Sequence, residues 1–267
     1  MSIDIRTIQN IELQILKDFV ALLKKNNIDY FLAYGTTLGC VRHNGFIPWD
    51  DDIDVYIWGK DYEKIRSIFE KENTGYLKFH DYATVDGYPY VFPKVIDSRT
   101  ILKEKEFEHL AYECGIYVDV FPLFEVPNNK LLRRISEKIR YFRYAIVRMA
   151  YLSGGEIGGT KKYVAKLIKK LVNVNKIQHK LFNTYTNQNI KGELLAEPNI
   201  FKEKKLVKKQ YFADSCKMIF EDTQMPIPID YKGYLKSVYG DYMQLPKEED
   251  RVPCHSFSKL IINNEEV

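Results

Sequence analysis

Apolar side chains recur every three or four positions along residues 7–26, which is the spacing of one face of a helix. The same spacing predicts helices at 60–73, 130–152, 160–189 and 230–239, the last of them after a proline-rich segment expected to form turns. Shorter apolar and aromatic runs predict strands. They cover residues 28–34, 52–57, 76–82, 90–97, 100–105 and 115–123. This mixture of helices and strands predicts an α+β fold with one mixed sheet.

The composition is that of a folded protein without an extracellular signature. The chain has 267 residues, of which 45% are hydrophobic and 14% aromatic, and this content excludes global disorder. Its four cysteines are scattered and form no CxxC pair, so neither a zinc knuckle nor a redox motif is indicated. No signal peptide and no apolar run of about 18 residues is visible. We therefore expect a protein of the reducing cytoplasm.

The net charge of +4 hides an asymmetry along the chain. Residues 1–120 carry 14 Lys and Arg against 20 Asp and Glu, whereas residues 121–267 carry 26 against 16. The basic residues are densest in the two long predicted helices at 130–152 and 160–189. Such helices either present a solvated charged face or dock on an anionic membrane surface. No nucleic-acid-binding motif accompanies them, so nucleic acid is not expected as a partner.

Four aspartates in five positions, Asp50, Asp51, Asp52 and Asp54, lie among apolar residues. Asp52 and Asp54 are two apart on a predicted strand, so both side chains should leave the same face. Carboxylates this close repel unless a cation lies between them, and hard oxygen ligands suit Mg²⁺, or else Mn²⁺. For Asp50 and Asp51 an exposed acidic turn is an equally good interpretation. For the other two we predict metal binding, because burying unpaired charge is costly.

The preceding segment "YGTTLGCVRH" is typical of a phosphate-binding turn. Gly35 follows a predicted strand and precedes a short helix, where backbone N–H groups can approach a phosphate. Thr36 and Thr37 could add hydroxyl donors. Such turns are common, but this one leads directly to the strand with the aspartates. A phosphate cradle and a metal clamp are therefore predicted on neighbouring elements.

Together these residues resemble the LicD family of the nucleotidyltransferase superfamily. The resemblance rests on "YGTTLGCVRHNGFIPWDDDIDV" and continues in "GIYVDVFPL" and "YLKSVYGDYMQLP". It implies a palm-type mixed sheet like that of polymerase β-type enzymes. We expect residues 1–127 to form the nucleotidyltransferase-like core, and residues 128–267 to form a mostly helical region that packs on it and closes the cleft.

The resemblance also implies a reaction. Family members transfer phosphocholine from CDP-choline, or a related alcohol phosphate such as ribitol phosphate, to a cell-surface glycan or its lipid-linked precursor. By analogy, Asp52, Asp54 and Asp119 would bind the catalytic Mg²⁺, and Asp119 could instead accept the acceptor's proton. The acceptor hydroxyl would attack the distal phosphorus and release CMP. The lipid-linked acceptor makes the inner face of the membrane an expected place of contact.

Three further residues are candidates for supporting roles, and a fourth is interpreted as structural. Arg42 and Lys94 are predicted to contact the donor phosphates, although Lys94 could equally be an exposed strand residue. His255 is a candidate proton carrier, whereas His43 is interpreted as structural.

The aromatic side chains near the motif could face a choline ammonium group, but each is more simply explained as a core residue. They are Tyr34, Trp49, Tyr56 and Trp58.

Two other functions compete with this one. A nucleotide-sugar glycosyltransferase also uses an Asp-x-Asp metal site, but its doubly wound domain needs more than the roughly 50 residues that precede Asp52. A non-catalytic nucleotide-binding module with a decayed site is the second alternative. The intact acids and the Gly-Thr turn argue against decay.

Overall fold

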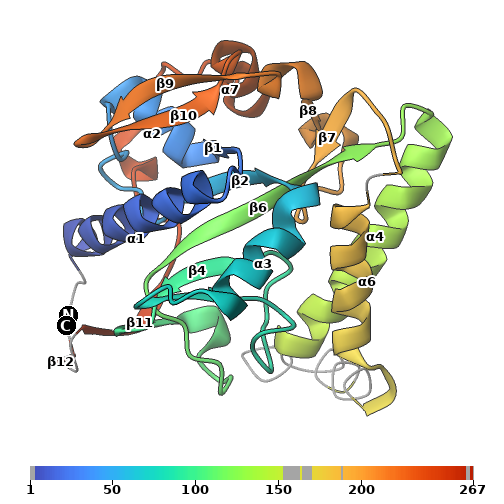
Figure 1. The fold of residues 1–267 in the computed structure, drawn as a ribbon, viewed down its shortest axis with the longest axis horizontal. Helices are drawn as coiled ribbons and strands as arrows, with labels where there is room; N and C mark the ends of the chain where they lie inside the picture. The colour runs from blue at the N-terminus through green and yellow to red at the C-terminus, as the bar shows by residue number, and fades with distance from the viewer. Residues whose placement is uncertain (1–3, 153–162, 164–169, 188, 263–264, 267) are drawn as a thin grey trace.

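The structure is a computed structural model that describes residues 4–152, 163, 170–187, 189–262 and 265–266. Its centre is a mixed sheet whose strands follow the order β1-β2-β6-β4-β3, with β7 and β8 added at the far end of β6. Helices α1 and α3 lie across this sheet (Figure 1). The strands are β1 (Tyr30–Leu32), β2 (Asp54–Trp58), β3 (Leu77–His80), β4 (Lys94–Asp97), β6 (Tyr117–Val126), β7 (Leu194–Ala196) and β8 (Val207–Lys208).

The pairing of β2 with β6 is parallel, and it places Asp54 directly opposite Asp119. Strand β6 is the longest of the sheet and is buried along almost its whole length. Its first half pairs with β4 and its last residues pair with β7, both antiparallel. The predicted α+β class and mixed sheet are confirmed.

Helices α1 (Ile5–Lys25) and α3 (Tyr62–Lys71) form where the apolar spacing predicted them. The short helix expected after the Gly-Thr turn is α2 (Tyr34–His43), which already begins before Gly35 and includes the turn. Helix α1 is capped by Asp4, whose carboxylate accepts from the Arg6 N–H. Helix α2 begins two residues after β1 and ends at Asn44, which has a left-handed backbone. Gly39 lets the chain turn back closely there, because a Cβ atom at this position would lie 2.4 Å from the Gly45 carbonyl oxygen.

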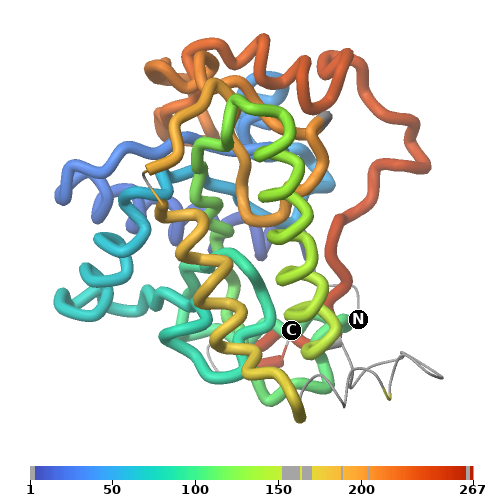
Figure 2. Tube along the Cα trace, turned by 90° about the vertical axis from the view of Figure 1, so that its right-hand side faces the viewer, coloured from blue at the N-terminus to red at the C-terminus, as the bar shows by residue number. Residues whose placement is uncertain are grey.

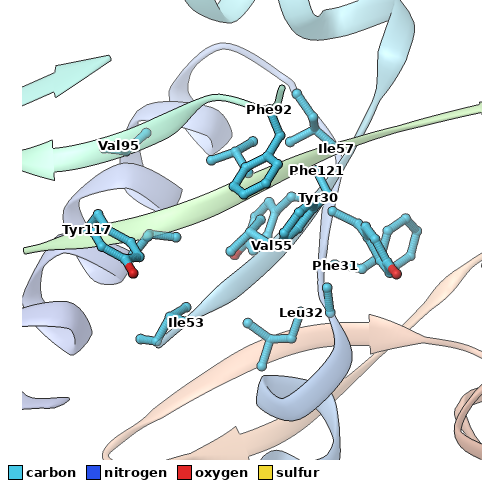
Figure 3. Close-up of a cluster of buried hydrophobic side chains, with 14 of the residues drawn as sticks. Tyr30, Phe31, Leu32, Ile53, Val55, Ile57, Phe92, Val95, Tyr117 and Phe121 are labelled. Atoms are coloured by element: carbon cyan, nitrogen blue, oxygen red, sulfur yellow. The ribbon is translucent and has the colours of Figure 1, made fainter. Parts of the chain in front are cut away.

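The core lies on both faces of the central strands. Figure 3 shows side chains of β1, β2, β4 and β6 packed together, among them Phe31, Val55 and Phe121. Aromatic contacts extend this core toward later segments, since Phe31 meets Phe212 edge-on with ring centroids 5.4 Å apart. This contact ties strand β1 to the segment that contains Phe212.

Two helices cover one side of the sheet. Helix α4 (Lys130–Leu152) and helix α6 (Val174–Thr186) lie side by side at the right of Figure 1 and face the viewer in Figure 2. The predicted helix at 130–152 is confirmed. The predicted helix at 160–189 is described only in part, and its segments 160–162 and 164–169 lie outside the described residues.

The region after residue 128 contains strands as well as the expected helices. Besides α4, α6 and α7 it contains strands β7 to β12, and β7 extends the central sheet. The proline-rich segment before α7 is a strand and not a set of turns. Strands β9 (Ser215–Phe220) and β10 (Thr223–Pro228) form a hairpin, and helix α7 (Tyr231–Tyr239) follows it. Near the C-terminus, β11 (Phe257–Ile262) pairs with β12 (Glu265–Glu266) and with β5 (Thr100–Glu104) from the first half of the chain.

Short 3₁₀ turns complete the described fold. They span Gly59–Asp61, Lys105–Phe107, Glu203–Lys205, Lys209–Phe212 and Glu248–Asp250.

Candidate active site

Three carboxylates meet at the start of the parallel strand pair. Asp52, Asp54 and Asp119 each offer an oxygen, and these oxygens all lie within 4.8 Å of one another. Asp54 is the first residue of β2, and its partner in the register is Asp119 on β6. Asp52 lies before the strand begins, so the expectation that both acids sit on one strand is wrong. The chain nevertheless brings the Asp52 side chain to the same place.

Burial raises the pKa of each acid of this trio. Desolvation and the charges of Asp52 and Asp119 hold the pKa of Asp54 well above its ordinary value. Burial raises the pKa of Asp52 to about 6. Three converging carboxylates are the donor set that Mg²⁺ or Mn²⁺ prefers, and a divalent cation would offset the charge that burial penalises. The residues therefore fit such an ion.

Lys94 lies inside this cluster and not on the surface. It is 1% exposed, and its Nζ donates to Asp119 Oδ1 at 2.7 Å. The ammonium also lies 3.3 Å from the centroid of the Tyr117 ring and 3.9 Å from a Glu104 oxygen. The interpretation of Lys94 as an exposed strand residue is wrong. Its contact with a donor phosphate stays a prediction.

Asp51 fastens the C-terminal segment to the acidic motif. One of its oxygens accepts from the Cys254 N–H at 3.1 Å, and the other accepts from the His255 N–H at 2.9 Å. The His255 ring also bonds Asp51 through Nδ1 at 3.1 Å. With 1% exposure and these partners, Asp51 is an anchor and not part of an exposed acidic turn.

The anchor brings His255 to the trio. Its Nδ1 lies 3.9 Å from Asp52 Oδ2. Burial opposes the charged imidazolium, but the bond to Asp51 and the charge of Asp52 outweigh it and raise the pKa of His255 to about 9. The histidine is therefore a cation at neutral pH. The structure confirms that it returns to the cluster, while its role as a proton carrier stays a prediction.

The Gly-Thr turn is the first turn of α2, beside the acids. A Cβ atom on Gly35 would lie 2.7 Å from Asp50 Oδ2, so only glycine fits there without a shift. Thr36 Oγ1 accepts from the Asp54 N–H at 2.8 Å and ties the turn to β2. Thr37 is fully buried and donates to the Leu32 carbonyl. Its hydroxyl is thus bonded inside the protein, contrary to the expectation of a free phosphate donor.

Arg42 joins this turn to the segment that follows α7. Its Nη1 donates to the Tyr242 carbonyl at 3.0 Å, and its Nε donates to His43 Nε2 at 3.0 Å. The structural interpretation of His43 agrees with this bond. Arg42 is half-buried near Asp50, whose pKa is raised to about 8 by burial and by neighbouring aspartates. Phosphate binding by Arg42 stays a prediction.

Two buried acids escaped the sequence reasoning. Glu12 on α1 is 1% exposed, and burial and the charges of the aspartates raise its pKa. It lies on the apolar face of its helix, one turn from Ile8 and Leu16. A charged residue at a position where the helical spacing predicts an apolar one could have indicated this buried acid from the sequence. Glu197 accepts a short hydrogen bond from Tyr34, which has a left-handed backbone. Nothing in the sequence near Glu197 indicated this contact.

The aromatic candidates divide between the cluster and the opposite end of β2. Tyr34 and Tyr56 pack against each other with ring centroids 5.4 Å apart, and Tyr56 lies on β2 two residues after Asp54. Trp49 meets His43 edge-on. Trp58 ends β2, four residues beyond Asp54, and borders a hollow of about 370 Å³ with Lys60 and other residues. Core packing explains the tyrosines, as expected.

Comparison with known proteins agrees with this geometry. Residues 27–134, which contain all three acids, match the family described as LicD/FKTN/FKRP, nucleotidyltransferase domain. The lipopolysaccharide cholinephosphotransferase LicD of Haemophilus influenzae is 30% identical over 260 residues, which cover 94% of this chain and 96% of that protein. The chain belongs to the LicD family. It is accordingly an enzyme, a phosphotransferase of the LicD type.

Shorter similarities fall on part of the chain. A protein of Rickettsia prowazekii is 36% identical over 114 residues, or 39% of this chain, and one of Rickettsia typhi is 37% identical over 102 residues.

None of the helices in the described part of the chain has the length and apolar character needed to cross a bilayer.

Proposed function

We propose that this LicD-family enzyme transfers phosphocholine, or a related alcohol phosphate, from a CDP-linked donor to a hydroxyl of a cell-surface glycan or its lipid-linked precursor. The observation that carries the proposal is the meeting of Asp52, Asp54 and Asp119 at one point of a chain that aligns over 94% of its length with a cholinephosphotransferase. We assign the sheet to the polymerase β-type palm, since Asp54 and Asp119 lie opposite each other on adjacent parallel strands and Asp52 lies just before the first of these strands.

The three acids would hold Mg²⁺, with Mn²⁺ as an alternative. When bound, the ion supplies positive charge to the phosphate oxygens and to the departing CMP. Lys94 keeps the Asp119 carboxylate oriented through its bond of 2.7 Å. We assign the Gly35 turn, which lies in the first turn of α2, to the binding of a donor phosphate by backbone N–H groups.

In the proposed step the acceptor oxygen forms a bond with the distal phosphorus while the bond from phosphorus to the CMP oxygen breaks. CMP leaves with the electron pair. The hydroxyl proton passes to a carboxylate of the trio, for which Asp119 is our assignment. His255, which Asp51 holds 3.9 Å from Asp52, is our candidate for the proton carrier.

The acceptor's chemistry suggests where the enzyme works. CDP-linked donors and lipid-linked glycan precursors meet at the inner face of the cytoplasmic membrane, and we place the enzyme in the cytoplasm at that surface. This placement rests on the acceptor class and on the basic helices.

A donor screen tests the proposal. Purified protein with Mg²⁺ is incubated with CDP-choline, CDP-ribitol or UDP-sugars and a range of acceptors, and the released nucleotide is measured. We expect CMP from a CDP-alcohol, lost in Asp52→Asn and retained in the control Asp86→Asn, whose side chain is exposed. Release of UDP would instead indicate a glycosyltransferase. Absence of turnover with every donor would indicate a binding module.

A further inference from the structure

The first three turns of α4 have their polarity reversed relative to an ordinary surface helix. The buried positions carry Arg133, Glu137 and Arg140, and each of these residues is at most 7% exposed. The outward positions carry large apolar side chains. Those exposed are Leu131 (68%), Leu132 (56%), Ile135 (47%), Ile139 (46%) and Phe142 (68%). A surface helix in water shows the opposite arrangement.

Two of the three inward charges, Arg133 and Arg140, have specific hydrogen-bond partners. Arg133 donates to the carbonyls of Pro127 and Asn128 and pairs with Glu203 at 2.7 Å. Arg140 donates to the Ile200 carbonyl at 3.0 Å, and its guanidinium lies over the Phe124 and Phe201 rings. The contacts of these two arginines fix which side of α4 faces the protein. The apolar side must therefore face outward.

The outward residues form one continuous stripe. At roughly 100° per residue, positions 131, 142, 135, 139 and 132 lie within about 100° of the helix circumference. Figure 2 shows α4 running across the front of this side of the molecule, with α6 beside it. An exposed apolar stripe of this kind on a described helix marks an interaction surface.

Cations line one flank of the stripe. A hollow of about 480 Å³ lies there, bordered by Arg134, Lys138, Lys202 and Lys205 together with Tyr141 and Phe201. Glu137 also borders it, but this acid is buried between Arg133 and Arg140 on the same helix. The four cations are exposed and their positive charge matches a phosphate-bearing headgroup.

We propose that this face of α4, defined by Leu131, Ile135, Ile139 and Phe142 with the adjacent hollow, docks the enzyme on a bilayer that contains anionic phospholipid. The apolar stripe enters the boundary between headgroups and acyl chains, and the hollow receives a lipid phosphate. The biological purpose, access to a lipid-linked acceptor, rests on the proposed function. The docking itself does not require the transferase reaction.

Vesicle co-sedimentation of the full chain tests the docking without any turnover. The probes are vesicles of phosphatidylcholine alone and vesicles that also contain about a third phosphatidylglycerol. We expect binding to the anionic vesicles, at least tenfold weaker binding to neutral ones, and weakening by salt. Ile135→Asp/Ile139→Asp should reduce binding at least tenfold. The matched control Ile219→Asp/Met243→Asp changes equally exposed apolar residues elsewhere and should bind as the native chain does.

A second variant tests the hollow. Lys138→Glu/Lys202→Glu keeps the apolar stripe and should also lose at least tenfold on anionic vesicles. Circular dichroism and the melting temperature verify that each variant folds. Binding unchanged in both α4 variants, or no binding to any vesicle, overturns the proposal. So does a native dimer in light scattering that Ile135→Asp/Ile139→Asp converts to a monomer, because the face would then be covered by a second copy. If the donor screen shows no release of CMP, the proposed function fails, but the vesicle experiment still tests the docking because vesicle binding requires no turnover.

Discussion

The acid trio predicts a specific thermal response to magnesium, which the substitution Asp54→Asn should abolish. The oxygens of Asp52, Asp54 and Asp119 lie within 4.8 Å of one another. At an effective dielectric constant of about 20, two ionised groups at that distance repel by about 3.5 kcal/mol. Asp54 takes part in two of the three pairs. Replacing it with the isosteric, neutral asparagine removes both repulsions and one metal ligand.

The pH dependence follows from the raised pKa values. An acid whose pKa is higher in the folded than in the unfolded state stabilises the fold at low pH, and loses that contribution as pH rises through the folded pKa. For Asp52 the window runs from its ordinary 3.8 to about 6. That shift corresponds to about 3 kcal/mol, or a fall in melting temperature of about 6–12 °C. The metal-free protein should therefore melt progressively lower as pH rises from about 4 to about 7.

Magnesium should reverse this loss. An ion present at 100 times its dissociation constant stabilises the fold by about 2.7 kcal/mol, which corresponds to about 5–11 °C. Differential scanning fluorimetry at pH 7.5, with and without Mg²⁺, measures the shift. We expect the full shift in the native chain and in Asp86→Asn, and less than about 2 °C in Asp54→Asn. An unchanged magnesium shift in Asp54→Asn, or a native stability that rises between pH 4 and 7, would refute the reasoning.

Three further substitutions test the supports of the site. Lys94→Met leaves the buried Asp119 charge without its partner at 2.7 Å and should cost about 3–5 kcal/mol in urea denaturation; a loss below 1 kcal/mol contradicts the ion pair's importance. Asp51→Ala removes the carboxylate that accepts from the backbone N–H groups of residues 254–255. Limited proteolysis should therefore cut that segment faster than in the native chain. An unchanged cutting rate would show that the anchor is dispensable. Gly39→Ala should destabilise by at least about 1–3 kcal/mol because its Cβ meets backbone at 2.4 Å; native stability would show that the turn can yield.

The sequence alone determined what depends on neighbours along the chain. Helix α1, the helix α2 and the aspartate-bearing strand β2 follow from local spacing, because helix and strand periodicities are set within a few residues. The hairpin β9–β10 was missed because its prolines read as turn residues. Proline is tolerated there because the hairpin is a separate two-stranded sheet with open edges.

The tertiary structure decided which distant residues meet. The parallel register of β2 and β6 places Asp119 beside Asp54, and the pairing of the C-terminal segment with the motif makes Asp51 an anchor for His255 across 204 positions. It also decided that α4 turns Arg133 and Arg140 inward and its leucines and isoleucines at 131, 132, 135 and 139 outward. An amphipathic pattern predicts that a helix has one apolar and one polar face. Which face is buried depends on the partners that the rest of the chain supplies, here the carbonyls and rings that receive Arg133 and Arg140.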